Sequence, residues 1–222
     1  MKIPTYVQNP TNVHCQQAVQ AMVLVDFRYA TFAGSRMFGA LDKMNHAEPN
    51  QWTSDYPGIL GMAQEGMSVV FGSSYDLTEY ADGPYGMYLK YCGRTVADTF
   101  NKRLNLESCS DAARNLSNFS ASNYRNIKKS VTKDILELLD RGYLVNAWVD
   151  SGRMRESKKF SGHYVLLYGH DGTSITFHDP GGSLSRGSSK NISNRMTINR
   201  FDQCRRYPET NNTGTFIAYR QI

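Results

Sequence analysis

The chain has 222 residues, 40% of them hydrophobic, and its 25 basic and 20 acidic residues give a net charge of +5. This length suits one large domain or two small ones, and so small a charge is typical of an ordinary solvated surface, so we expect no nucleic-acid binding. No apolar run approaches the roughly 20 residues that cross a bilayer, and the N-terminus lacks a signal-peptide core. We therefore expect a single domain that resides in the cytoplasm, with secretion by a non-classical route left open.

The cysteines indicate a reducing compartment. The four of them, at positions 15, 92, 109 and 204, show neither a CxxC pattern nor the spacing of metal ligands. Free thiols are the simplest reading, and a Cys92–Cys109 bridge stays open for an exported protein. We expect neither a metal nor a cofactor.

The first predicted element is a buried helix from about Cys15 to Tyr29. Residues 1–14 contain two prolines and favour an extended lead-in. Apolar residues then recur at helical spacing, which predicts the helix and places Cys15 in its first turn. A cysteine there is most often a small core residue. The helix N-terminus would nevertheless favour the nucleophilic thiolate, because its unpaired N–H groups and positive dipole end face the sulfur.

In the middle of the chain the sequence predicts helices and a strand but no candidate catalytic residues. Residues 30–57 are broken by glycine and proline, and nothing catalytic stands out there. Beyond them the patterns favour helices at 58–65, 84–91 and 95–104, a strand at 67–71, and a Ser/Asn-rich loop at 115–126.

The last third of the chain predicts a sheet. Thr132 caps a strong helix that Gly142 ends, and a strand follows at 143–149. A basic connection, 150–161, leads to further strands, and residues 181–189 form a flexible surface loop. With a helical part at about 12–141 and a sheet part at about 143–222, this order is that of an α+β fold in one domain, with the Cys15 helix packed on an antiparallel sheet.

A hairpin at 162–180 organises the chain, because two strands flank an Asp-Gly turn. If the loop has three residues, His170 to Gly172, His163 lies opposite Asp179, with Cβ atoms about 5 Å apart. If Asp171 and Gly172 alone form the loop, Asp179 moves to the other face. The residues permit either register, and the first would give His163 an orienting carboxylate.

Together these residues could make a thiol-based active site. Such a site needs a nucleophile, a base, a group that orients the base, and donors for the oxyanion. Cys15 would be the nucleophile, His163 the base and Asp179 its orienter. Gln8 could donate its side-chain N–H to the oxyanion, with the backbone N–H of Cys15 as the second donor. Each part alone is commonplace, but the combination is informative.

The order of these motifs resembles the bacteriocin-processing (double-glycine leader) peptidase-like family of papain-like cysteine peptidases. The matching features are Gln…Cys-x-x-Ala on an apolar helix, a helix ending in Leu-x-x-Gly, then Gly-His-Tyr-Val-Leu-Leu-Tyr-Gly-x-Asp-Gly and Asp-Pro. The resemblance implies Cys15, His163, Asp179 and Gln8 in the four roles above, a peptide or protein substrate, and the three-residue hairpin loop. The chain departs from the family in having Gln16 where Gly is usual, and in a Gln8 one residue further from the cysteine.

Three other functions remain open from the sequence. The same site could transfer an acyl group to an amine, as a transglutaminase or a ligase does. An inactive peptidase fold could instead bind a peptide or a partner. A metal site is the weakest alternative, because His163, His170 and His178 share the hairpin but no carboxylate or thiol completes a ligand set.

Overall fold

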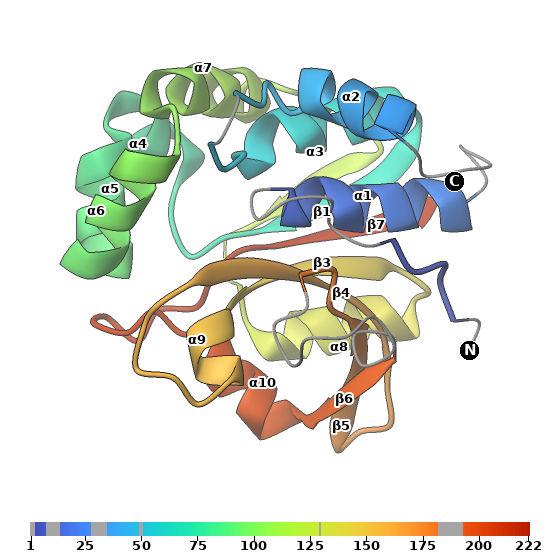
Figure 1. The fold of residues 1–222 in the computed structure, drawn as a ribbon. Coiled ribbons are helices and arrows are strands. Elements are labelled where there is room, and N and C mark those ends of the chain that lie inside the picture. The colour runs from blue at the N-terminus through green and yellow to red at the C-terminus, as the bar shows by residue number, and fades with distance from the viewer. Residues whose placement is uncertain (1–2, 8–13, 28–34, 49–50, 129, 182–192) are drawn as a thin grey trace.

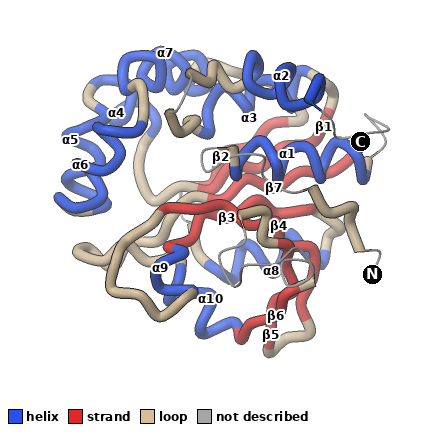
Figure 2. The backbone as a smooth tube through the Cα atoms, viewed as in Figure 1, coloured by secondary structure: helices blue, strands red, loops and turns tan. Residues whose placement is uncertain are grey.

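The centre of the fold is a seven-stranded sheet (Figures 1 and 2). The computed structural model describes residues 3–7, 14–27, 35–48, 51–128, 130–181 and 193–222. Within them the strand order is β2-β1-β7-β3-β4-β5-β6, with β1 and β2 parallel and the other neighbours antiparallel. The strands are β1 (Met67–Gly72), β2 (Tyr124–Ile127), β3 (Leu144–Asp150), β4 (Gly162–His170), β5 (Ser174–His178), β6 (Asn194–Thr197) and β7 (Phe216–Gln221).

Helices cover both faces of the sheet. On one face α1 packs on β3 and β4 while α3 packs on β1, and on the other face α8 packs on β3 and β4 while α10 packs on β5 (Figure 1). The N-terminal helices are α1 (Cys15–Asp26), α2 (Ser35–Met44), α3 (Asp55–Gln64), α4 (Leu77–Asp82), α5 (Pro84–Cys92), α6 (Arg94–Arg103) and α7 (Leu106–Ser117). The remaining helices are α8 (Thr132–Asp140), α9 (Ser151–Met154) and α10 (Ile198–Cys204). The predicted α+β architecture, with the Cys15 helix on a largely antiparallel sheet, is confirmed.

Two hydrophobic cores lie on opposite sides of the sheet. Leu166 and Tyr168 of β4 belong to the core under α1, whereas Val165 and Leu167 belong to the core under α8. Successive side chains of a strand point to opposite faces, so one strand feeds both cores. Every residue of β3 is buried for the same reason, which explains its nearly continuous apolar sequence.

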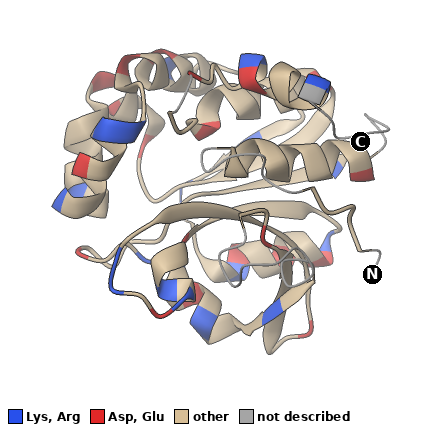
Figure 3. Ribbon diagram, in the orientation of Figure 1, with Lys and Arg blue, Asp and Glu red and all other residues tan. Residues whose placement is uncertain are grey.

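Helix α1 is buried because it lies between the sheet and the helices α2 and α3. The residues from Gln16 to Val23 are all buried, and Figure 3 shows almost no charge on this helix. Its glutamines have partners on the neighbouring helices: Gln20 exchanges hydrogen bonds with Asn45, at 2.7 and 3.3 Å. The predicted buried helix is therefore confirmed, although it ends at Asp26.

The predicted register of the hairpin is wrong. His170 pairs with Ile175 and the Asp171 N–H donates to Ser174 O, so the turn lies at Gly172-Thr173, and neither predicted loop occurs. The Asp171 carboxylate stabilises this turn by accepting from the backbone N–H groups of Thr173 and Ser174. Short-range propensity located the turn but missed this side-chain contribution.

A β-bulge then corrects the alignment of the two strands. The register shifts by one residue between Leu167 and Gly169, after which Leu166 pairs with His178. Continued without the bulge, the turn-side register would set Asp179 opposite Leu166, on the other face from His163. The shifted register beyond the bulge, continued by one residue, instead sets Asp179 opposite Val165, on the same face of the sheet as His163. Bulges commonly re-aim a side chain in this way.

Several local predictions also need correction. The segment 115–126 is not simply a loop, because α7 runs to Ser117 and β2 begins at Tyr124. Thr132 does not cap α8; Val131 takes the N-cap position, and the Thr132 hydroxyl donates to Asp202 at 2.7 Å. Gly142 does end α8 in the left-handed region, with φ +79°. The predicted surface loop at 181–189 lies almost entirely outside the described residues.

Candidate active site

Cys15 is the first residue of α1, and its side chain is half-buried. The N-cap position belongs to His14, whose side chain makes no capping hydrogen bond. The first N–H groups of a helix have no partner within the helix, so the positive end of the helix dipole lies beside the sulfur. The packing of α1 on β4 brings this helix start to the strand that carries His163.

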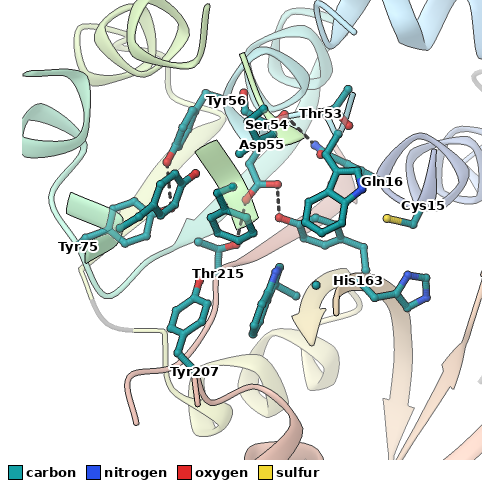
Figure 4. A pocket seen from close by; sticks show the side chains of 17 residues that line it. Cys15, Gln16, Thr53, Ser54, Asp55, Tyr56, Tyr75, His163, Tyr207 and Thr215 are labelled. Atoms are coloured by element: carbon teal, nitrogen blue, oxygen red, sulfur yellow. Dashed lines mark hydrogen bonds between the residues drawn. The ribbon is translucent and has the colours of Figure 1, made fainter. Parts of the chain in front are cut away.

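His163 connects Cys15 to Asp179. Its Nε2 lies 2.7 Å from Asp179 Oδ1, and its ring lines the same cavity as the Cys15 thiol, close enough for the two groups to interact electrostatically. Because Nε2 is engaged by the carboxylate, Nδ1 is the ring nitrogen left for the thiol. Figure 4 shows the Cys15 sulfur and the His163 ring on the same side of a cavity.

The surroundings of His163 favour its charged form. Burial alone would lower its pKa, but the hydrogen bonds to Asp179 and Cys15, and the negative charge that each partner can carry, raise the pKa to about 10. An imidazolium held between a carboxylate and a thiol is what a thiolate–imidazolium pair requires.

Asp179 is fixed in place behind the His163 ring. It is fully buried directly after β5. Its Oδ1 accepts from the Gly181 N–H at 2.9 Å as well as from His163, and Tyr6 donates to its backbone oxygen at 3.2 Å. Gly181 lies against the ring itself, because a Cβ there would be 2.5 Å from His163 Cε1. Gly181 therefore limits the movement of the His163 ring at Cε1.

The other two histidines of the hairpin have structural partners. His178 is buried, with Nε2 2.9 Å from Pro4 O, and its Nδ1 accepts from the Ser193 N–H at 3.1 Å. Nε2 of His170 lies 3.0 Å from Asp140 Oδ1. Among the described residues, no three His, Cys, Asp or Glu side chains are arranged to hold a metal ion.

The structure therefore brings three of the four predicted residues together. His163 lies between the other two, with Asp179 on one side of its ring and the Cys15 side chain lining the same cavity. Gln8 lies outside the described residues. The other cysteines are all free, buried thiols. Burial raises their pKa values, that of Cys92 to about 12.

A narrow cavity of about 60 Å³ opens beside Cys15 and His163 (Figure 4). Aromatic rings form much of its wall, and four buried polar side chains, Gln16, Asp55, His163 and Thr215, also line it. The sequence singled out Gln16 only as a departure from the family pattern. It gave no role to Asp55, which lies in the stretch 30–57 where nothing catalytic stands out.

The Asp55 carboxyl is buried and held by hydroxyl groups. Tyr164 donates to its Oδ1 at 2.5 Å and Thr215 donates to its Oδ2 at 2.9 Å. Burial raises the pKa of Asp55 to about 6, and the two hydrogen bonds partly oppose this shift. The carboxyl is thus mostly ionised at neutral pH.

Comparison with known proteins gives one family. A sequence model of the Peptidase C39 like family matches residues 1–214. Among solved structures, the chain is similar to the peptidase domain of Streptococcus ComA, which is described as a bi-functional ABC transporter involved in a quorum-sensing pathway. That likeness has 14% sequence identity and a TM-score of 0.45, and it covers 98% of this chain and 100% of the other. No curated protein sequence matches. Within the described residues, no helix is both long and apolar enough to span a membrane.

Proposed function

Because the chain belongs to the Peptidase C39 like family, we propose that it is a cysteine peptidase whose catalytic residues are Cys15, His163 and Asp179. The observation that supports this proposal is the position of His163, whose ring lies 2.7 Å from Asp179 Oδ1 and lines the same cavity as the Cys15 side chain. A peptide or a protein is the substrate.

In the proposed reaction, the Cys15 thiolate attacks the carbonyl carbon of the scissile bond and forms a tetrahedral adduct. His163 holds the proton that the thiol gave up. It passes this proton to the leaving amine, which departs and leaves a thioester on Cys15. His163 then takes a proton from water, the hydroxide attacks the thioester, and Cys15 is released with the acid product.

Asp179 would fix the orientation and the tautomer of His163 throughout this cycle. Its carboxylate accepts from Nε2, which keeps Nδ1 directed to the sulfur, and it favours the imidazolium that each half-reaction forms. The Gly181 N–H and the burial of Asp179 keep the carboxylate in place.

The negative charge of the tetrahedral adduct needs donors. The backbone N–H of Cys15, at the start of α1, is one. The Gln8 side chain is our candidate for the second, on the strength of the family pattern seven residues before the cysteine. The same donors would serve acyl transfer to an amine.

Peptide cleavage tests the proposal. The full chain is incubated with a mixture of unmodified peptides, and the products are identified by mass spectrometry, with and without an added amine. Cleavage products should appear with the wild type and disappear with Cys15→Ala and with His163→Ala, whereas Cys204→Ala, in the core on the other side of the sheet, should leave them. Products that carry the added amine would make the enzyme a transferase, and cleavage that survives Cys15→Ala would reject the proposal.

A further inference from the structure

The cavity beside Cys15 offers hydrogen-bond acceptors and aromatic faces to whatever enters it. One acceptor is the Asp55 carboxylate, which no cation of the described residues neutralises, since its partners are the hydroxyls of Tyr164 and Thr215. Gln16 also lines the cavity and is 1% exposed. Its amide donates to Asn45 and to Ser54 O, while its Oε1 has no partner among the described residues.

The walls of the cavity reinforce this polarity. Rings such as Trp52, Tyr75 and Trp148 line it, and the face of an aromatic ring carries partial negative charge that attracts a cation. An apolar side chain would leave the Asp55 charge uncompensated, which is costly in a buried site. An acidic side chain would meet a second negative charge.

The size of the cavity limits the occupant. About 60 Å³ holds roughly four to six water-sized groups, at about 10–15 Å³ for each. An unbranched chain that ends in several N–H donors fits this space, as a bulky ring would not. Because Cys15 and His163 line the same cavity, the occupant is a side chain close to the scissile bond.

We propose that this cavity is a specificity pocket for a basic side chain, lysine or arginine, of a substrate residue next to the scissile bond. The proposal rests on the proposed peptidase function. The cationic group would donate to Asp55 while its methylene chain contacts the aromatic walls.

The charge outside the cavity is opposite to that inside. A groove beyond Trp52 is lined by the basic residues Lys102, Arg103, Arg155 and Lys159. Long-range attraction therefore does not select a basic side chain, and selection depends on the contacts inside the cavity. Probes for this pocket should accordingly have neutral flanking residues.

Matched covalent probes test the proposal. Dipeptidyl acyloxymethyl ketones, which alkylate active-site cysteines, are made with lysine, arginine or uncharged norleucine next to the reactive ketone, and a second set varies the preceding position. The second-order rate of labelling is measured on the full chain at pH 7.5. In one of the two sets, the lysine or arginine probe should react about tenfold or more faster than the norleucine probe, as expected for charge-assisted hydrogen bonds.

The Asp55→Asn variant should reduce this basic-to-norleucine ratio to about one. Asp111→Asn, which removes an exposed carboxylate on α7, should leave the ratio unchanged. In the wild type, the ratio should also fall as the pH is lowered through about 6, where Asp55 takes up a proton. Tyr75, Cys109, Tyr164 and Tyr219 are the titratable groups around Asp55, and burial keeps all four neutral over this range. The Cys15–His163 pair affects all probes alike and cancels in the ratio.

The wild-type pH profile decides the question if Asp55→Asn does not fold. Equal rates for basic and norleucine probes in both sets would overturn the pocket while leaving the peptidase proposal intact. A basic preference that persists in folded Asp55→Asn, or below pH 5 in the wild type, would also overturn it. No labelling of Cys15 by any probe would instead contradict the proposed function.

Discussion

The most specific prediction concerns Gly181, which lies against the Cε1 edge of the His163 imidazole. A methyl group added in Gly181→Ala would sit 2.5 Å from His163 Cε1 and 3.1 Å from Nε2, whereas ordinary contacts begin at 3.4 Å. The ring or the backbone must therefore shift by about 0.9 Å. Gly181 is not among the residues with positive φ, so the backbone itself would accept alanine, and the effect comes from this one contact.

The size of the effect follows from the hydrogen bonds that the shift breaks. If the ring moves, its 2.7 Å bond to Asp179 stretches toward about 3.6 Å, beyond hydrogen-bonding range. If the backbone moves instead, the Gly181 N–H leaves Asp179 Oδ1. A misplacement of about 1 Å at a catalytic group costs about 10²-fold in rate, so we expect a loss of this order in kcat/KM.

The assay is the labelling rate of Cys15 with a peptidyl acyloxymethyl ketone, followed by intact-protein mass spectrometry. Gly86→Ala is the matched control, because a Cβ at this exposed position in α5 meets nothing within 4 Å. That variant should label at the wild-type rate. If Gly181→Ala labels within twofold of the wild type and is folded, the position of the His163 ring does not control the thiol, and the reasoning fails.

Three further predictions concern titration and packing. In a ¹⁵N NMR titration, the His163 imidazole should keep its proton to about pH 10. Asp179→Asn should lower the midpoint of this titration, because burial lowers the pKa of His163 and only Cys15 then opposes that effect. An unchanged midpoint would show that Asp179 does not interact with His163. Since the folded pKa of His163 lies above its unfolded value of about 6.5, its charge stabilises the fold fully below that pH, and the stabilisation is lost as the pH rises toward 10. The difference in unfolding free energy between the wild type and His163→Asn should thus shrink between pH 6.5 and 9 in urea denaturation, and a difference that grows would contradict the assigned shift. Gly58→Ala should destabilise the protein by about 1–3 kcal/mol, because its Cβ would lie 2.2 Å from Gln20 Nε2 and 2.3 Å from Asn45 Oδ1. The control Gly39→Ala, at an exposed position in a helix, should lose no stability. Equal thermal stability of the two variants would count against this packing.

The sequence was most informative where one local pattern decides the structure. Helical spacing located α1, α3, α5, α6 and α8, and Gly142 marked the end of α8, whereas no helix was predicted at α2 or α4. The family pattern selected His163 over His170 and His178, and the partners of the latter two, Asp140 and Pro4, are consistent with that choice. We continue to propose a single domain for residues 1–222, with β1 and β2 of the N-terminal part completing the same sheet.

What the sequence could not give depends on distant contacts. The hairpin was predicted with its loop in the wrong register, and the contact between His163 and Asp179 exists because a bulge near Tyr168 compensates. No local pattern announces that bulge. Asp55 escaped notice for a similar reason: its burial depends on Tyr164 and Thr215, which lie more than 100 residues away.

The four thiols of the chain permit the most direct test of the account. The native protein is treated with a limiting amount of a peptidyl acyloxymethyl ketone and digested, and the label on each cysteine is quantified by peptide mass spectrometry. We predict that the label is found on Cys15, because burial raises the pKa of the other three thiols, and that His163→Ala abolishes it. Label distributed over Cys92, Cys109 and Cys204, or undiminished labelling of Cys15 in His163→Ala, would contradict the account.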